Sequence, residues 1–160
     1  MELSIRPATR LDYPSICEIF AEGETFHAAA LPDVFRVGDG PIHTEEFVFQ
    51  AIEDEDVALL VADEGGEVVG VVHVVVRRSP DFSSLVPRCY ANVESLVVGA
   101  GFRRRGIGRA LMEEAHHWAA GKGLPGIELT VWEFNKGAIA LYEELGYTTA
   151  HRKMWRSTSL

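Results

Sequence analysis

Short apolar runs and two amphipathic stretches alternate over the first fifty residues. Residues 3–6 alternate between apolar and polar side chains and end at a proline, which predicts a short strand. Apolar residues recur at helical spacing from residue 9 or 10 to 21, with Pro14 in the first turn, and again over about 41–52. Two helices are therefore expected, and the segment 23–39 between them is expected to be irregular.

Three strands are predicted in the middle of the chain, where β-branched residues are most frequent. The runs 57–62 and 67–76 flank Asp63–Gly66, whose two adjacent glycines can take positive φ and predict a hairpin turn. Residues 77–87 contain two prolines and are expected to form a loop. The run 90–98 is expected to be the third of these strands.

The last third of the chain predicts two helices, each followed by a strand. Gly106–Ala120 carries apolar residues on one side and charged residues on the other, and a strand is expected over 127–131. Asn135 is expected to cap a helix that ends at Gly146, and 147–155 is expected to be a final strand. The order β-α-α-β-β-β-α-β-α-β predicts an α/β protein of mixed α+β type, built around a central sheet.

Composition narrows the class of protein. The 160 residues, with 47% hydrophobic and 24% charged side chains, predict a single globular domain over 1–160. The two cysteines are too few for a disulfide scaffold or a four-ligand zinc site, and we expect free thiols in a reducing, cytoplasmic compartment. The N-terminus shows no apolar leader, and no apolar run is long enough to span a bilayer, so no membrane is expected as a partner.

Charge is distributed unevenly between the two halves of the chain. Residues 1–80 carry 5 basic and 16 acidic groups, a net −11, whereas residues 81–160 carry 10 basic and 8 acidic groups, a net +2. An acidic half disfavours nucleic acid as a partner and favours a cationic one. The alternative is that most of these carboxylates only keep the surface solvated.

A glycine-rich turn, Gly101–Gly108, lies between a predicted strand and a predicted helix. Glycines let the backbone approach a ligand closely, and a helix N-terminus presents unpaired N–H groups, so together they predict a seat for phosphate. The turn lacks the Lys-Ser/Thr pair of a phosphate-binding loop for nucleoside triphosphates. It also lacks the third glycine of a dinucleotide fingerprint, because Arg104 stands in that place. The alternative is a tight turn with solvated arginines.

Two motifs in the second half carry a family resemblance. Arg103–Gly108 follows the order Gln/Arg-x-x-Gly-x-Gly/Ala, and Asn135–Tyr147 contains an asparagine, a helical Leu-Tyr pair and a closing Leu-Gly-Tyr. In this order and separation they resemble the two hallmarks of the GNAT superfamily of N-acetyltransferases. The resemblance extends in element order over nearly the whole chain. It implies a central mixed, mostly antiparallel sheet flanked by about four helices.

The resemblance implies an acyltransferase that uses acetyl-CoA as co-substrate and needs no metal. Strand backbone would meet the pantetheine arm, amides of the glycine turn would wrap the pyrophosphate, and Asn135 would contact the cofactor near a divergence of two strands. The residues implied for cofactor binding are Leu96, Val97, Val98, Arg103, Arg104, Arg105, Gly106, Ile107, Gly108, Arg109, Asn135 and Tyr142.

Tyr142 and Glu94 are the candidate catalytic residues. By the resemblance, Tyr142 lies beside the cofactor sulfur and acts as general acid; the alternative is core packing, because it lies on the apolar face of its helix. Glu94 interrupts an apolar strand, and polyamine acetyltransferases of the superfamily carry a glutamate at the matching position. It is the candidate base, directly or through water, unless it merely pairs with an arginine. The amide of Val97 or Val98 is the implied oxyanion donor.

The function expected is transfer of an acetyl group to a primary amine by direct attack on the thioester. The acceptor is expected to be a small cationic amine held by 23–39, the second helix and 77–87. Thr130 stands where enzymes that acetylate ribosomal-alanine-type protein N-termini carry a glutamate, which disfavours, without excluding, a protein N-terminus or lysine. Two rival hypotheses are a non-catalytic acyl-CoA-binding domain of the same fold and a nucleotide-binding protein. The oligomeric state is left open, and a homodimer is compatible with the sequence.

Overall fold

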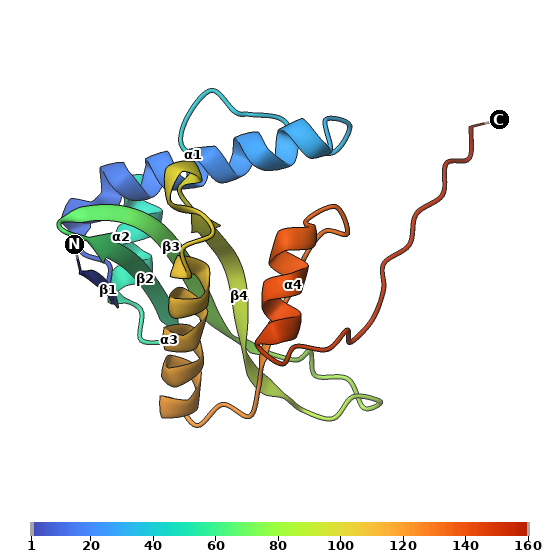
Figure 1. The fold of residues 1–160 in the computed structure, drawn as a ribbon. Helices are drawn as coiled ribbons and strands as arrows, with labels where there is room; N and C mark the ends of the chain where they lie inside the picture. Colours follow the sequence, from blue (N-terminus) through green and yellow to red (C-terminus); the bar gives the residue numbers. More distant parts are fainter. Residues whose placement is uncertain (1, 160) are drawn as a thin grey trace. The chain divides into compact units, whose positions relative to one another are not determined.

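The computed structural model describes residues 2–159, which form two compact units divided after Thr130 (Figure 1). The single domain expected over 1–160 stays a prediction. The first unit contains β1 (Leu3–Pro7), a 3₁₀ turn (Arg10–Asp12), α1 (Tyr13–Ala30), α2 (Glu45–Glu53), β2 (Val57–Glu64), β3 (Glu67–Arg78), β4 (Cys89–Val98), a second 3₁₀ turn (Ala100–Phe102), α3 (Ile107–Gly121) and β5 (Ile127–Leu129). The second unit contains α4 (Lys136–Glu144).

The sheet is mixed and mostly antiparallel, as predicted. Its strands lie in the order β1-β2-β3-β4-β5, with antiparallel pairing between the first four strands and parallel pairing between β4 and β5. The predicted hairpin joins β2 to β3, and Gly65 and Gly66 take φ values of 65° and 93°. Glycine suits both positions because it has no Cβ to clash in the left-handed region.

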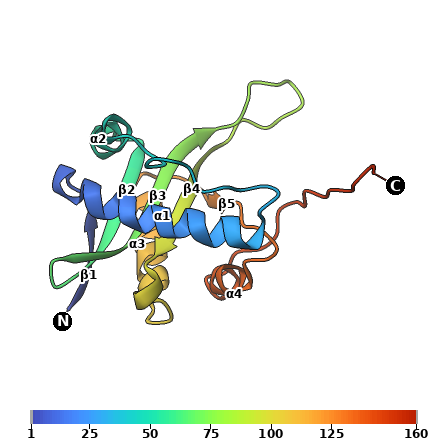
Figure 2. The same cartoon turned by 90° about the horizontal axis from the view of Figure 1, so that it is seen from above.

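Helices cover both faces of the sheet (Figures 1 and 2). On one face, Ile16 and Phe20 of α1 and Val48 of α2 form a buried cluster with Val61 and Val71 of the sheet. On the other face, α3 packs closely on β3. A Cβ built at Gly70 would lie 3.1 Å from Leu111 Cδ1 and 3.3 Å from Ile107 Cγ2, so glycine permits this close approach of the helix to the strand.

The first helix is longer than predicted. The helix was expected to end at Ala21, but α1 continues to Ala30 and includes part of the segment 23–39 that was expected to be irregular. Gly23 is buried inside α1, where its Cβ would lie 3.1 Å from Val97 Cγ2 of β4. A mid-helix glycine costs about 1 kcal/mol in local propensity. Here its small size lets α1 pack on the sheet, and this tertiary contact decides the helix length.

Three further boundaries differ from the sequence predictions. The second helix begins at Glu45, because Thr44 Oγ1 accepts a hydrogen bond of 3.2 Å from the Phe47 amide and caps it there. The strand predicted over 127–131 ends at Leu129. The final strand predicted over 147–155 is wrong: the segment is irregular, and Met154 and Trp155 are 87% and 88% exposed. A segment does not form a stable strand unless a neighbouring strand takes up its backbone hydrogen bonds.

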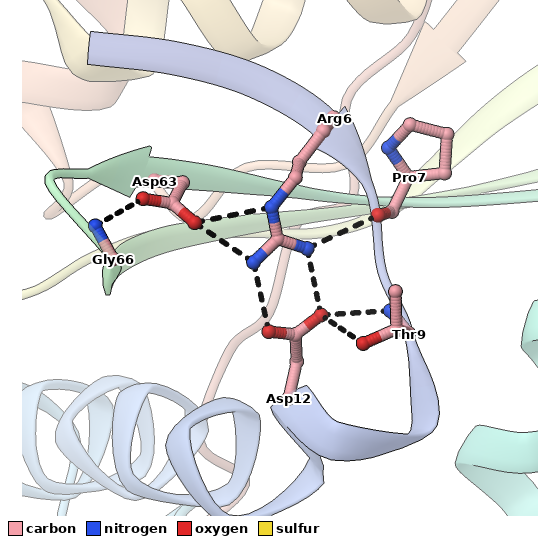
Figure 3. Close-up of polar contacts among 6 residues, drawn as sticks. All are labelled: Arg6, Pro7, Thr9, Asp12, Asp63 and Gly66. Atoms are coloured by element: carbon pink, nitrogen blue, oxygen red, sulfur yellow. Dashed lines mark hydrogen bonds and ion pairs between the residues drawn. The ribbon is translucent and has the colours of Figure 1, made fainter. Parts of the chain in front are cut away.

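An arginine and two aspartates join β1, the start of α1 and β2 (Figure 3). Arg6 donates hydrogen bonds to both oxygens of Asp12, at 2.8 and 2.9 Å, and to Asp63 Oδ2 at 2.9 and 3.1 Å. Asp12 also accepts from the amide and hydroxyl of Thr9. Its hydrogen bonds with Arg6 are the main reason that the pKa of Asp12 falls to about 2. This network fixes the first helix against the sheet.

Candidate functional site

The strand β4 has an open edge over its last five residues. It pairs with β5 only at Ala91, Asn92 and Val93, whereas β3 pairs along its other edge as far as Val98. Among the described residues, no strand therefore pairs with the β5-side edge of 94–98, and backbone groups of that edge are available to a ligand. Leu96, Val97 and Val98, the predicted pantetheine contacts, lie in this segment and are partly buried.

A β-bulge lies where the open edge begins. His73 of β3 pairs with Ser95 of β4, and Val74 pairs with Val93, so Glu94 has no residue opposite it. A bulge bends a strand and turns its side chains away from strict alternation. Glu94 and Ser95 accordingly both line one cavity. The sequence suggests that Glu94 is unusual in its strand, but the extra residue depends on pairing with β3 and has no local signal.

The glycine turn forms an uncapped helix N-terminus. Arg104 and Gly106 have φ values of 63° and 81°, and Gly106 is the N-cap of α3 without a side-chain cap. The first hydrogen bond of the helix runs from the Ala110 amide to the Gly106 carbonyl, so the amides of Ile107 and Gly108 precede the helical ladder. A Cβ at Gly106 would meet no atom within 4 Å. These amides and this open space fit a pyrophosphate group.

The arginines of the turn differ in their surroundings. Arg103 donates a 3.1 Å hydrogen bond from Nε to the carbonyl oxygen of Val98, and Arg105 pairs with Glu64 at 2.6 Å. The exposed Arg104 makes no ion pair or hydrogen bond through its guanidinium within residues 2–159, so it is available to an anion. Arg109 lies in the first turn of α3, and its role in cofactor binding stays a prediction.

In the second unit, Asn135 and Tyr142 lie in or next to α4. Asn135 caps this helix, as predicted, because its Oδ1 accepts a 3.3 Å hydrogen bond from the Ala138 amide. Tyr142 is buried, and burial raises the pKa of its phenol to about 12. Its ring centroid lies 5.7 Å from that of Tyr147. The phenol therefore stays protonated at neutral pH, as a general acid must.

A cavity of about 400 Å³ lies in the first unit between α2, β3 and β4. Two of the three segments expected to hold the acceptor contribute to the cavity lining: Phe47 comes from the second helix and Arg77 from 77–87. No residue of 23–39 lines it. His43 and His73, which were not among the predicted site residues, also face the cavity. The sequence places His73 on a predicted strand, from which it could face a cleft, but only the fold shows that it and His43 line the same cavity.

Glu94 is held on one side by one arginine and one asparagine amide. Its Oε1 accepts hydrogen bonds from Arg77 Nη2 at 2.5 Å and Nε at 3.2 Å, and from Asn92 Nδ2 at 3.1 Å. Oε2 accepts no hydrogen bond from residues 2–159. Both sequence hypotheses for Glu94 therefore keep support: it pairs with an arginine, and it retains a free oxygen beside a cavity.

Aromatic rings surround the two histidines of the cavity. His43 stacks on Phe47 with ring centroids 4.2 Å apart, and Phe20 meets His43 edge-on at 5.2 Å. Burial lowers the pKa of His43, against the opposing charge of Glu24. Burial likewise lowers the pKa of His73, against the opposing charge of Glu94. Both imidazoles are thus neutral at neutral pH.

Neither a metal cluster nor a membrane-spanning helix is present in the described part of the chain. Residues 2–159 contain no cluster of three or more histidine, cysteine, aspartate or glutamate side chains that could hold a metal ion. None of the helices formed by these residues is both long and apolar enough to cross a bilayer.

Comparison with known proteins identifies the class. Residues 17–147 match the acetyltransferase (GNAT) family, and the chain therefore belongs to that family and is an N-acetyltransferase. N-acetyltransferase YhfO of Bacillus subtilis is 26% identical over 145 residues, which cover 91% of this chain and 89% of the relative. Thialysine N-epsilon-acetyltransferase of Caenorhabditis elegans is 38% identical over 58 residues, 36% of each chain.

Solved structures have the same fold. A mutant of the BH1408 protein from Bacillus halodurans superimposes with a TM-score of 0.90 at 25% identity, covering 98% of this chain and 99% of that one. An aminoglycoside acetyltransferase from an uncultured soil sample gives a TM-score of 0.70 at 16% identity, covering 99% and 96%. The predicted family and fold class are confirmed.

Proposed function

We propose that this N-acetyltransferase transfers the acetyl group of acetyl-CoA to a primary amine of a small cationic molecule. One observation carries the proposal: Glu94 and Ser95 belong both to the open edge of β4 and to the wall of the cavity. An extended pantetheine arm along that edge would bring its thioester to the mouth of the cavity. An amine inside the cavity would then be next to the reacting carbonyl.

The donor is proposed to bind along β4 and at the start of α3. Backbone groups of Leu96, Val97 and Val98 would hydrogen-bond the pantetheine arm, and an amide of Val97 or Val98 would stabilise the oxyanion. The amides of Arg104 to Arg109 would meet the pyrophosphate. The free guanidinium of Arg104 adds a positive charge beside them. The open space at Gly106 supports this fit.

The acceptor is proposed to approach Glu94. One carboxylate oxygen is occupied by Arg77 and Asn92, so the other can contact the ammonium group without breaking that pair. Asp54 also lines the cavity and adds a second carboxylate. The net charge of −11 on residues 1–80 also attracts a cation from a longer distance. Tyr142 is proposed to protonate the leaving thiolate, with its pKa of about 12 keeping the proton available.

Two relatives bear on the substrate class. The relative from Caenorhabditis elegans is named as a thialysine N-epsilon-acetyltransferase, and the structure from the soil sample is named as an aminoglycoside acetyltransferase. These names describe those proteins. They support the choice of small cationic amines as the first panel to test, ahead of protein N-termini or lysines.

The test is release of free CoA from acetyl-CoA in the presence of matched cationic, neutral and anionic amines, with mass spectrometry of the products. We expect the highest kcat/KM with a cationic amine. Tight binding of acetyl-CoA without turnover on any amine would support a non-catalytic acyl-CoA-binding domain. If only peptide N-termini or lysines are acetylated, the acceptor is a protein and not a small amine. Binding of NAD or ATP without acetyl-CoA would overturn the donor assignment.

A further inference from the structure

His73 has an unusual position in the cavity wall. Its side chain is only 6% exposed and lies edge-on to the rings of His43 and Phe47, with centroids 6.3 and 5.9 Å away. Within residues 2–159 neither ring nitrogen makes a hydrogen bond. Every fully enclosed side-chain nitrogen or oxygen in that part of the chain has a partner, so the ring nitrogens of His73 are not fully enclosed and open to the cavity.

The same residue is next to the reacting edge. His73 pairs with Ser95 across the sheet, immediately beside the bulge at Glu94. The cavity wall thus brings a carboxylate oxygen and an unpartnered imidazole together at the first residues of the open edge of β4. His43, the other neutral imidazole of the cavity, lies before α2 and is not on a strand that pairs with β4.

The charges around His73 come from three sides. Glu94 on β4 raises the pKa of His73, while His43 before α2 and Arg77 on β3 lower it, and burial lowers it most. Asp54, at the end of α2, lines the same cavity, and β2 contributes the apolar Val57. The imidazole is thus neutral at neutral pH and can accept a proton. Because Glu94 already accepts a hydrogen bond from the Arg77 guanidinium, it is better suited to hold a cation than to take its proton.

We propose that His73 is the catalytic base that takes a proton from the acceptor ammonium, while Glu94 holds that ammonium in place. The proposal rests on the proposed function, whose cavity and thioester position it uses. Apolar surroundings disfavour charge on the ammonium and lower its pKa, which eases transfer of its proton to a neighbouring base.

Protons and electron pairs balance over the whole reaction. The ammonium gives one proton to a ring nitrogen of His73, and the lone pair released on the amine forms a bond to the thioester carbonyl carbon. The carbon–sulfur bond then breaks and its electron pair leaves on sulfur. The amide nitrogen loses a second proton, and the leaving thiolate gains one, so these two cancel. The imidazolium returns its proton to solvent, giving amide, thiol and one proton overall.

The test compares pH profiles of kcat/KM for a cationic amine in the wild type, His73→Gln and the control His117→Gln. His117 lies on α3, is exposed and pairs with Glu114. The wild type and His117→Gln should lose activity as pH falls through an apparent pKa below the ordinary histidine value of 6.5. His73→Gln should lose this acid limb, and its kcat should fall roughly 10²-fold while its affinity for acetyl-CoA is unchanged. Added imidazole should restore part of the rate in His73→Gly.

The outcomes separate this proposal from the proposed function. A wild type inactive on every amine refutes the proposed function itself. An active wild type, together with a His73→Gln variant that keeps both turnover and the acid limb, overturns only the role of His73. If His73→Gln does not fold, NMR titration of the six histidines in the wild type decides. The pKa of His73 must then match the kinetic acid limb, and a mismatch rejects the proposal.

Discussion

Arg77 donates two hydrogen bonds to the same oxygen of Glu94, from Nη2 at 2.5 Å and from Nε at 3.2 Å. The pair leaves Glu94 Oε2 free beside the cavity. The Glu94 carboxylate thus keeps one oxygen toward the acceptor even while it is paired, and the selectivity for cations should depend largely on this side chain.

Glu94→Gln should remove that selectivity. The glutamine keeps the size of the side chain but not its charge, so kcat/KM for a cationic amine should fall about tenfold or more, while an uncharged aromatic amine should be little affected. Steady-state kinetics with both amines, at low and high salt, measure the effect. In the wild type, added salt should narrow the gap between cationic and neutral amines. Selectivity in Glu94→Gln equal to that of the wild type would show that the cation is held elsewhere.

Gly106→Asp should abolish acetyl-CoA binding. The substitution places a carboxylate in the open space at the N-terminus of α3, where phosphate oxygens are proposed to lie. Gly106→Asn is the matched control for shape and for the positive φ of 81°, which aspartate and asparagine tolerate better than most residues. Calorimetry should show a much weaker affinity for Gly106→Asp than for Gly106→Asn. Equal affinities of the two folded variants for acetyl-CoA would show that the pyrophosphate does not bind at this turn.

Tyr142→Phe should slow chemistry without weakening donor binding. Loss of the phenol proton should reduce kcat roughly 10²-fold with little change in KM for acetyl-CoA, if chemistry limits turnover. Because burial raises the pKa of Tyr142 to about 12, wild-type activity should show no alkaline loss from this group below about pH 10. Tyr147→Phe, whose ring lies next to Tyr142, is the matched control and should keep wild-type turnover. If Tyr142→Phe keeps wild-type turnover, Tyr142 only packs in the core and is not the general acid.

Asp12→Asn should lower the unfolding free energy at neutral pH but not at acidic pH. The folded pKa of Asp12, about 2, lies below its ordinary value of 3.8, so its contribution is present above pH 3.8 and disappears as pH falls toward 2. The variant should lose about 2 kcal/mol of unfolding free energy at pH 7, and the difference should shrink below pH 3. Urea unfolding at both pH values measures it, with exposed Asp33→Asn as the control. A constant difference across this range would contradict the ion pair with Arg6.

Local features of the fold were predictable because their causes lie within a few residues. The two glycines at 65 and 66 define the hairpin by their positive φ, and Asn135 caps α4 through its own side chain. The glycine turn before α3 was recognisable from the spacing of Gly101, Gly106 and Gly108 for the same reason. Each of these features depends on backbone conformation or on a hydrogen bond over three or four positions.

Features that depend on distant partners were not predictable. The first helix was expected to end at Ala21 and the segment from Gly23 to be irregular, but α1 continues to Ala30, and Gly23 packs on Val97 within it. The segment 147–155 was interpreted as a strand, but within residues 2–159 no neighbouring strand pairs with it and it is irregular. In both cases, local preference is worth about 1 kcal/mol or less, and long-range packing outweighs it.

The sequence by itself determined the family, the mostly antiparallel sheet and the turn proposed to bind phosphate, because these depend on ordered motifs and local chemistry. Only the tertiary structure decided what surrounds Glu94. The bulge at Glu94 arises from the pairing of Ser95 with His73, and Arg77 reaches Glu94 from a neighbouring strand. The register of two strands brings together side chains that are about twenty residues apart, and no local pattern encodes a register.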